Sequence, residues 1–216
     1  MNVTQTINQG LRRVPAWTLY VAGAGWTAWL FWLGLTGNLG PEPVEALEHE
    51  YGELALKLIV LGLAVTPLRR YLGLNLMKFR RAIGVTAFFL VLAHFLVWAL
   101  LDVQTLSAVW ADIVKRTYIT IGMASLLLLI PLVVTSNNWS IRKMGGAAWR
   151  RLHRLVYPAA VLGVIHYIWL VKGFQIEPLV YAAIIGGLLA LRLDWKTWLG
   201  GFASSAHAPG GRGRAR

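Results

Sequence analysis

The sequence predicts an all-α fold, an integral membrane six-helix bundle with both chain termini in the cytoplasm. Of its 216 residues, 57% are hydrophobic and 14% are charged, too few polar groups to cover a water-soluble globule of this size. A spanning helix needs about 20 mostly apolar residues, so we expect roughly six spans and no separate soluble catalytic domain. The apolar runs are residues 16–36, 53–68, 82–101, 117–135, 155–171 and 178–193.

The distribution of charge predicts the orientation. With the N-terminus inside, most of the 21 Lys and Arg residues lie in cytoplasmic segments, and all but one of the nine acidic residues lie outside. We therefore expect a cytoplasmic N-terminus (1–15), a six-helix transmembrane domain (16–195) and a disordered, basic, glycine-rich cytoplasmic tail (196–216). The arginines that end the second and sixth runs, Arg69, Arg70 and Arg192, are expected to extend to the lipid headgroups.

Composition also restricts the partners and cofactors. The net charge of +12 is explained by basic helix ends at the cytoplasmic face, so we expect the lipid bilayer as a partner and no nucleic acid. The sequence has no Cys, which excludes disulfides, iron–sulfur clusters and thiolate ligands. A redox centre in this chain would use His or Met, or bind without a covalent ligand.

Two histidines lie within apolar runs, where ionisable groups are costly and are candidates for function. His94 and His166 stand about 17–18 Å from the cytoplasmic starts of the third and fifth runs, at a rise of about 1.5 Å per residue. Two neutral imidazoles at one depth on parallel helices suit the axial positions of a low-spin heme b iron. The alternative is that each histidine hydrogen-bonds to a neighbouring helix and stabilises packing.

A second group of candidates lies at the cytoplasmic ends of the same two runs. His153 is a candidate ligand for a second heme or another cofactor. Guanidinium groups suit the propionates of heme or the phosphate of flavin mononucleotide (FMN), although they equally suit the anchoring of helix ends. The arginine candidates are Arg80, Arg81, Arg150, Arg151 and Arg154.

The predicted outer loop before the second run is acidic. It carries Glu42, Glu45, Glu48, Glu50 and Glu53 around His49. Such a patch suits the steering of a basic periplasmic electron acceptor, or is the topological counterpart of the inner arginines. His49 is a candidate outer-face residue that caps a helix or contacts a partner, with a merely solvated side chain as the alternative.

Four stretches in this order resemble the MsrQ (YedZ) family. They are LAVTPLR (63–69), RRAIG (80–84) leading to His94, RTYITIG (116–122) and WRRLHRLVY (149–157) leading to His166. That family is the heme-binding membrane subunit of the periplasmic methionine sulfoxide reductase system. It lies within the ferric-reductase-like transmembrane superfamily, together with NADPH oxidases and metalloreductases. The resemblance covers about residues 15–195 and makes 16–195 a ferric-reductase-like heme domain.

The resemblance implies a multi-pass heme b protein of the bacterial inner membrane, and FMN is also associated with the family. Electrons would come from the quinone pool or a cytoplasmic flavin reductase. They would pass to a periplasmic molybdopterin subunit, MsrP, which reduces methionine sulfoxide in oxidised periplasmic proteins. By position, His94 and His166 match axial ligands and His153 matches a further family histidine. NADPH oxidases use four histidines for two hemes, whereas this chain has Arg80 and Arg81 in place of the fourth.

Two other functions remain open from the sequence. One is a cytochrome b that reduces another outer acceptor, such as ferric chelates. The other is a non-redox membrane transporter or assembly factor that uses its buried histidines for protons or packing. A heme protein with either acceptor is coloured when purified, whereas a transporter or assembly factor is colourless.

Overall fold

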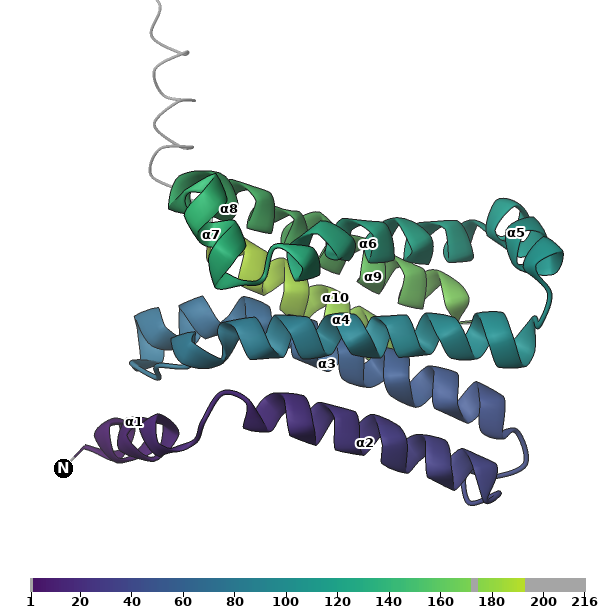
Figure 1. The fold of residues 1–216 in the computed structure, drawn as a ribbon, viewed down its shortest axis with the longest axis horizontal. Helices are drawn as coiled ribbons and strands as arrows, with labels where there is room; N and C mark the ends of the chain where they lie inside the picture. The colour runs from purple at the N-terminus through teal and green to yellow at the C-terminus, as the bar shows by residue number, and fades with distance from the viewer. Residues whose placement is uncertain (1, 172–174, 193–216) are drawn as a thin grey trace, which may run out of the picture.

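The computed structural model describes residues 2–171 and 175–192, and every regular element in that part is helical, which confirms the all-α prediction. Six helices overlap the six predicted apolar runs and lie side by side along one direction (Figure 1). They are α2 (Thr18–Leu35), α3 (Pro43–Leu72), α4 (Arg80–Val97), α6 (Thr117–Val134), α9 (Val156–Leu170) and α10 (Ile176–Ala190).

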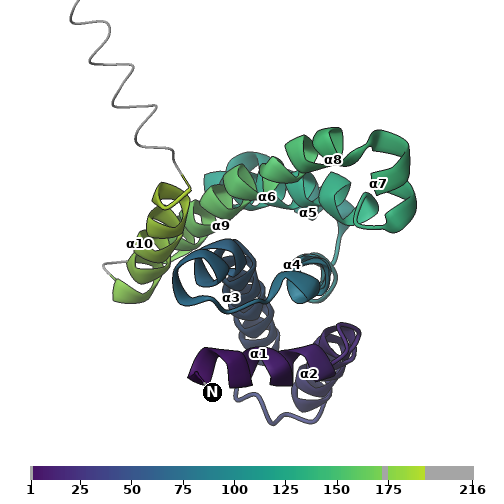
Figure 2. The same ribbon diagram turned by 90° about the vertical axis from the view of Figure 1, so that its left-hand side faces the viewer.

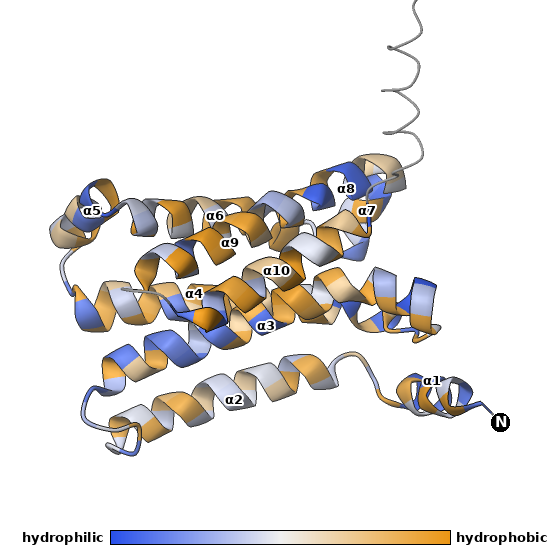
Figure 3. Cartoon of the chain, turned by 180° about the vertical axis from the view of Figure 1, so that it is seen from behind, coloured by the Kyte–Doolittle hydropathy of each residue, from blue (hydrophilic) through white to orange (hydrophobic). Residues whose placement is uncertain are grey.

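Three stretches of the described chain are long and apolar enough to cross a membrane. They are Pro43–Leu72, Met77–Asp102 and Thr117–Val134, and Ile176–Ala190 is a shorter apolar helix. In Figure 3, apolar residues fill the middle of α4, α6, α9 and α10, while hydrophilic residues gather on the first turns of α3 and around α7 and α8. This belt of apolar surface between two polar ends is the pattern of a protein that sits in a bilayer.

Apart from a π-helical turn, which forms the end of the third predicted run, the remaining elements lie where the sequence predicts connections or the N-terminal segment. They are α1 (Val3–Arg13), the single turn η1 (Met77–Phe79), the π-helical turn η2 (Trp98–Asp102), α5 (Leu106–Lys115), α7 (Asn138–Met144), α8 (Gly146–Leu152) and the turn η3 (His153–Leu155). Helix α1 runs crosswise at the end of the bundle (Figure 2). Its Asn8 binds the α3–η1 connection, donating to the Gly73 carbonyl and accepting from the Asn75 amide, both at 2.9 Å.

The helices form layers, with α2 on one side, α3 and α4 in the middle, and α6, α9 and α10 on the other side (Figures 1 and 2). The main core lies between α3, α4, α6, α9 and α10, where Ala159 and Ala160 are completely buried. Small residues let α6 and α9 approach closely, and the buried Ser125 hydroxyl of α6 donates to the Ala159 carbonyl at 2.8 Å. This close α6–α9 pair and the α3–α4 pair carry the candidate site.

Helix α3 and Arg192 differ from the sequence-based expectation. The second apolar run covers residues 53–68, whereas α3 spans Pro43–Leu72 and so begins within the predicted acidic outer loop, with Pro67 inside the helix. Proline has no N–H, so the carbonyl of Leu63, four residues earlier, loses its helical partner. Arg192 supplies the donor: its guanidinium binds the Leu63 carbonyl and also donates to the Tyr157 hydroxyl at 2.9 Å. Arg192 therefore turns into the bundle instead of extending to the headgroups.

The predicted tail, residues 196–216, lies outside the described residues.

Candidate functional site

The structure brings His94 and His166 together. His94 lies in the last turn of α4, and His166 lies four residues before the end of α9. The centres of the two imidazole rings are 6.2 Å apart, and the ring planes are nearly perpendicular, at 80°. A metal–imidazole bond is about 2 Å long, so two rings that face one metal ion have their centres roughly 6 Å apart. The pair thus has the spacing of two ligands on opposite sides of a single ion.

Each imidazole is held by a backbone carbonyl of the neighbouring helix. The Nδ1 atom of His94 lies 2.8 Å from the carbonyl oxygen of Glu48 in α3, and that of His166 lies 2.7 Å from the carbonyl oxygen of Tyr118 in α6. A carbonyl only accepts hydrogen bonds, so in each neutral ring Nδ1 carries the proton and Nε2 keeps its lone pair. Metal-ligating histidines are commonly oriented in this way.

Each ring also stands against a glycine of that neighbouring helix. A Cβ atom on Gly52 of α3 would lie 3.1 Å from Nδ1 of His94, and one on Gly122 of α6 would lie 2.8 Å from Nδ1 of His166. From the sequence, Gly122 appears only as the last residue of a family motif, and Gly52 is not among the candidates. The chain has many glycines, and only the structure shows which side of α3 and α6 faces the histidines.

A cavity of about 670 Å³ lies between the two histidine-bearing helix pairs. This volume is typical of cofactor pockets, which have roughly 300–1,000 Å³. Its inner wall is apolar and includes Ile59, Val91 and Leu126. Its mouth is acidic, and the carboxylates that line it are Glu42, Glu45, Glu48, Glu53, Asp102 and Glu177.

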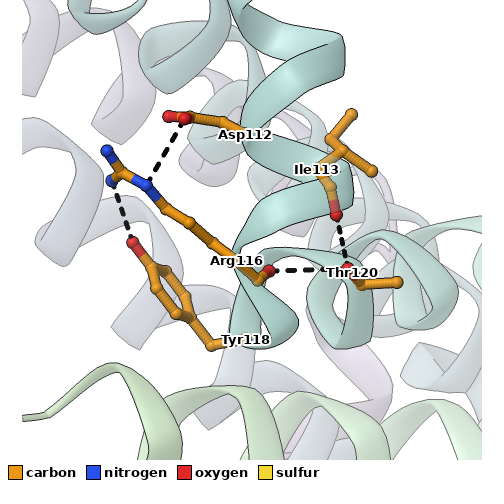
Figure 4. A network of polar contacts seen from close by, with 5 residues as sticks. All are labelled: Asp112, Ile113, Arg116, Tyr118 and Thr120. Carbon is orange, nitrogen blue, oxygen red and sulfur yellow. Dashed lines mark hydrogen bonds and ion pairs between the residues drawn. The ribbon is translucent and has the colours of Figure 1, made fainter.

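Arg116 is the one Lys or Arg among the described residues that line this cavity. It precedes α6, and its Nε lies 3.4 Å from Asp112 of α5 while a terminal nitrogen donates to the Tyr118 hydroxyl at 3.2 Å (Figure 4). The Thr120 hydroxyl donates a hydrogen bond to the Ile113 carbonyl at 2.5 Å, which links the start of α6 to α5 (Figure 4). In the sequence, Arg116 is visible only as part of a family motif, and its place at the cavity mouth was not predicted.

The cytoplasmic candidates lie elsewhere. His153 stacks on Trp149 with ring centres 3.7 Å apart, and its Nδ1 lies 3.1 Å from the Trp149 carbonyl. Its Nε2 lies 3.5 Å from the Ser136 hydroxyl, so both ring nitrogens face protein groups. Burial lowers the pKa of His153, and the positive charge of Arg80 acts in the same direction, which favours a neutral ring. His153 does not line the cavity.

The five candidate arginines also stay outside the cavity. Arg81, Arg150, Arg151 and Arg154 are exposed, Arg80 is half-buried, and none of them is among the cavity-lining residues. Arg81 donates to the Asn138 side chain of α7 at 2.9 Å. His49, in contrast, is exposed at the acidic mouth and does line the cavity.

The donor set fits a metal held in a macrocycle. Within residues 2–171 and 175–192, no three His, Cys, Asp or Glu side chains are placed to hold a metal ion by themselves. Two oriented imidazoles that share one cavity suit an iron whose other four ligands come from a porphyrin ring. The site and the fold together define an all-helical membrane protein with a cavity for a cofactor between two histidines.

Comparison with known proteins identifies the family. The model of the ferric reductase like transmembrane component matches residues 51–164, which include His94. A protein-methionine-sulfoxide reductase heme-binding subunit MsrQ from Brucella anthropi is 48% identical over 178 residues, covering 82% of this chain and 80% of the relative. The subunits of the same name from Brucella ovis and Brucella melitensis biotype 2 are each 49% identical over the same shares. The chain therefore belongs to the MsrQ family of ferric-reductase-like membrane proteins. No solved structure matches it.

Proposed function

We propose that this chain is the heme b electron-transfer subunit of a periplasmic methionine sulfoxide reductase system in a bacterial inner membrane. The observation that carries the proposal is the pair of carbonyl-anchored imidazoles, 6.2 Å apart, that line one cavity. The relatives named heme-binding subunits supply the identity of the cofactor. Catalysis on methionine sulfoxide belongs to the partner, because a bis-histidine iron leaves no open position for a substrate.

The chain's own residues bind the cofactor and set its surroundings. His94 and His166 would hold the heme iron through Nε2, and heme supplies reversible one-electron chemistry when it is bound. The carbonyls of Glu48 and Tyr118 keep each Nδ1 protonated and fix the ring planes. The apolar wall between α3, α4, α6 and α9 excludes water from the inner side of the site. Arg116, at the mouth, is placed to offset the negative charge of the propionates.

The proposed orientation puts six spans within residues 16–195, residues 1–15 and 196–216 in the cytoplasm, and the cavity towards the periplasm. The distribution of the 21 basic and nine acidic residues supports this orientation. Both ends of the bundle then carry an interfacial helix, α1 inside and α5 outside. On α5, the exposed Leu106, Trp110 and Val114 recur every fourth residue, as on a helix that lies in the headgroup region.

Electron entry is proposed at the cytoplasmic end. The exposed Arg81, Arg150, Arg151 and Arg154 and the half-buried Arg80 carry charge that suits the phosphate of FMN or the anionic surface of a flavin reductase. The quinone pool is the other donor. Both ring nitrogens of His153 have protein partners, so a flavin is favoured over a second heme at this end.

Electron exit is proposed at the acidic mouth of the cavity. Carboxylates of α3, η2 and α10 surround it, and this negative potential favours the docking of a partner with a basic face. We assign that partner as the periplasmic molybdopterin subunit MsrP. The same potential disfavours anionic ferric chelates, the acceptors in the alternative function.

The test begins with the purified, detergent-solubilised chain. We expect a Soret band, a sharp reduced α band and about one heme per chain in a pyridine hemochrome titration, with FMN extracted and measured from the same sample. The reduced protein is then mixed with purified MsrP, with ferric citrate, or with buffer. Fast heme reoxidation by MsrP alone is expected. A colourless protein would support a transporter or assembly factor, and equal rates with ferric citrate would support a ferric reductase.

A further inference from the structure

We propose that Gly52 and Gly122 are positioning residues that aim the two imidazoles at one iron and fix the angle between their planes. The inference rests on the proposed heme function. It assigns the setting of the site to two residues of α3 and α6 that carry no functional group. These two glycines contribute by having no side chain where the imidazole rings pack against α3 and α6.

The same arrangement of a histidine, a glycine and a backbone carbonyl occurs twice in the structure. In the first unit, His94 of α4 packs on Gly52 of α3, and its Nδ1 lies 2.8 Å from the carbonyl oxygen of residue 48. In the second, His166 of α9 packs on Gly122 of α6, and its Nδ1 lies 2.7 Å from the carbonyl oxygen of residue 118. In both units the accepting carbonyl lies four residues, one helical turn, before the glycine.

This spacing explains why the residue must be glycine. In an α-helix the carbonyl at one position accepts the N–H four residues later, so in each unit the glycine N–H and the histidine Nδ1–H share one oxygen. To reach that oxygen, the imidazole has to lie directly over the glycine. A β-carbon at that place would meet the ring within 3.1 Å at Gly52 and within 2.8 Å at Gly122. The ring, held between the carbonyl and the cavity, would have to tilt or leave the carbonyl.

Two other helical glycines of the bundle, Gly84 and Gly186, lack such a contact. A Cβ atom added to Gly84 of α4 or Gly186 of α10 would have no atom within 4 Å under the same measure. Gly84 shares its helix with His94, and neither glycine lines the cavity. Alanine is also the better helix former by about 0.5–1 kcal/mol. Gly84→Ala and Gly186→Ala are therefore matched controls that add the same methyl group without touching a histidine.

The ring angle gives a spectroscopic readout that general destabilisation does not produce. The two imidazole planes are 80° apart, and each plane is fixed by its carbonyl. Nearly perpendicular axial imidazoles give ferric low-spin heme a strongly axial EPR signal, and the signal becomes rhombic as the planes approach parallel. A tilt of either ring changes this signal even in protein that still binds heme and remains folded.

The experiment uses the full-length, heme-loaded chain and compares Gly122→Ala and Gly52→Ala with Gly84→Ala and Gly186→Ala. We record the low-spin EPR signal, carbon monoxide binding to the reduced protein, and the rate of heme transfer to apomyoglobin. We expect Gly122→Ala to make the EPR signal rhombic or high-spin, to allow carbon monoxide binding, and to weaken heme retention about 10- to 100-fold, as loss of a ligand-orienting contact does. Gly52→Ala should have the same effects to a smaller extent.

The outcomes separate this inference from the proposed function. A wild-type protein that binds no heme overturns both. Wild-type heme with an unchanged EPR signal and unchanged heme retention in both Gly122→Ala and Gly52→Ala overturns the positioning role and leaves the heme function intact. Equal losses in Gly84→Ala and Gly186→Ala would assign the effect to general packing and would also overturn it. If Gly122→Ala does not fold, the milder Gly52→Ala contact still decides the question through its EPR signal.

Discussion

His94→Ala and His166→Ala are each expected to abolish the low-spin heme spectrum. Each substitution removes one of the two imidazoles that line the cavity, and no other His of the described chain lies within it except the exposed His49 at the mouth. The remaining single imidazole leaves a five-coordinate or empty site. The measurement is the reduced-minus-oxidised absorption spectrum together with heme per chain, and we expect heme content to fall at least several-fold.

Two further substitutions serve as controls for this prediction. His49→Ala removes an exposed side chain at the cavity mouth and should leave the spectrum unchanged. His207→Ala alters the predicted tail and should also leave it unchanged. Full retention of the bis-imidazole spectrum in either His94→Ala or His166→Ala would refute the ligand assignment.

Arg192→Met is expected to cause the largest loss of stability among substitutions away from the cavity. Arg192 is partly buried at the end of α10, where its guanidinium binds the Leu63 carbonyl and the Tyr157 hydroxyl. Methionine keeps the length of the side chain but donates no hydrogen bond. An unsatisfied buried polar group costs about 1–3 kcal/mol, and each kcal/mol shifts Tm by about 2–4 °C for a chain of this size. Thermal unfolding of the detergent-solubilised protein measures the shift.

A double-mutant comparison tests the cause of that loss. Pro67→Ala restores the N–H that pairs with the Leu63 carbonyl within α3. Arg192→Met should then cost less in the Pro67→Ala protein than in the wild type. Arg69→Met, at an exposed arginine of α3, is the matched control and should change Tm little. An equal cost of Arg192→Met in both backgrounds would show that the Leu63 carbonyl is not the group that matters.

Hydropathy predicted the helices that overlap apolar runs and failed for those that do not. Helix α1 has an apolar residue at every fourth position, Val3, Ile7 and Leu11, between polar residues, so its average hydropathy is low. A search for membrane spans by average hydropathy misses such interfacial helices. The 3.6-residue period of their apolar residues can nevertheless be recognised in the sequence. The donor that compensates for Pro67 within α3 was not predictable, because Arg192 lies far away in the sequence.

The site was predictable to the level of its histidines. The depth of His94 and His166 in their apolar runs indicated that they share one level, and they lie 6.2 Å apart. Their partners were not predictable, because a backbone carbonyl leaves no trace in the sequence. Gly52 and Gly122 resemble other glycines until the facing helix is known. The five candidate arginines were assigned to the cytoplasmic end by charge alone, whereas Arg116, at the junction of α5 and α6, lines the cavity.

The histidines lie close to one end of their helices, and this position has an electrical consequence. In the proposed orientation, an electron that enters from a cytoplasmic donor crosses most of the bilayer's electric field before it reaches the iron. Bacterial membranes are negative inside, so this movement is downhill by about 2.3 kcal/mol per 100 mV for a full crossing. Heme reduction by a cytoplasmic donor should therefore accelerate when vesicles are energised. Reduction by a quinol oxidised near the periplasmic face should not respond to the voltage.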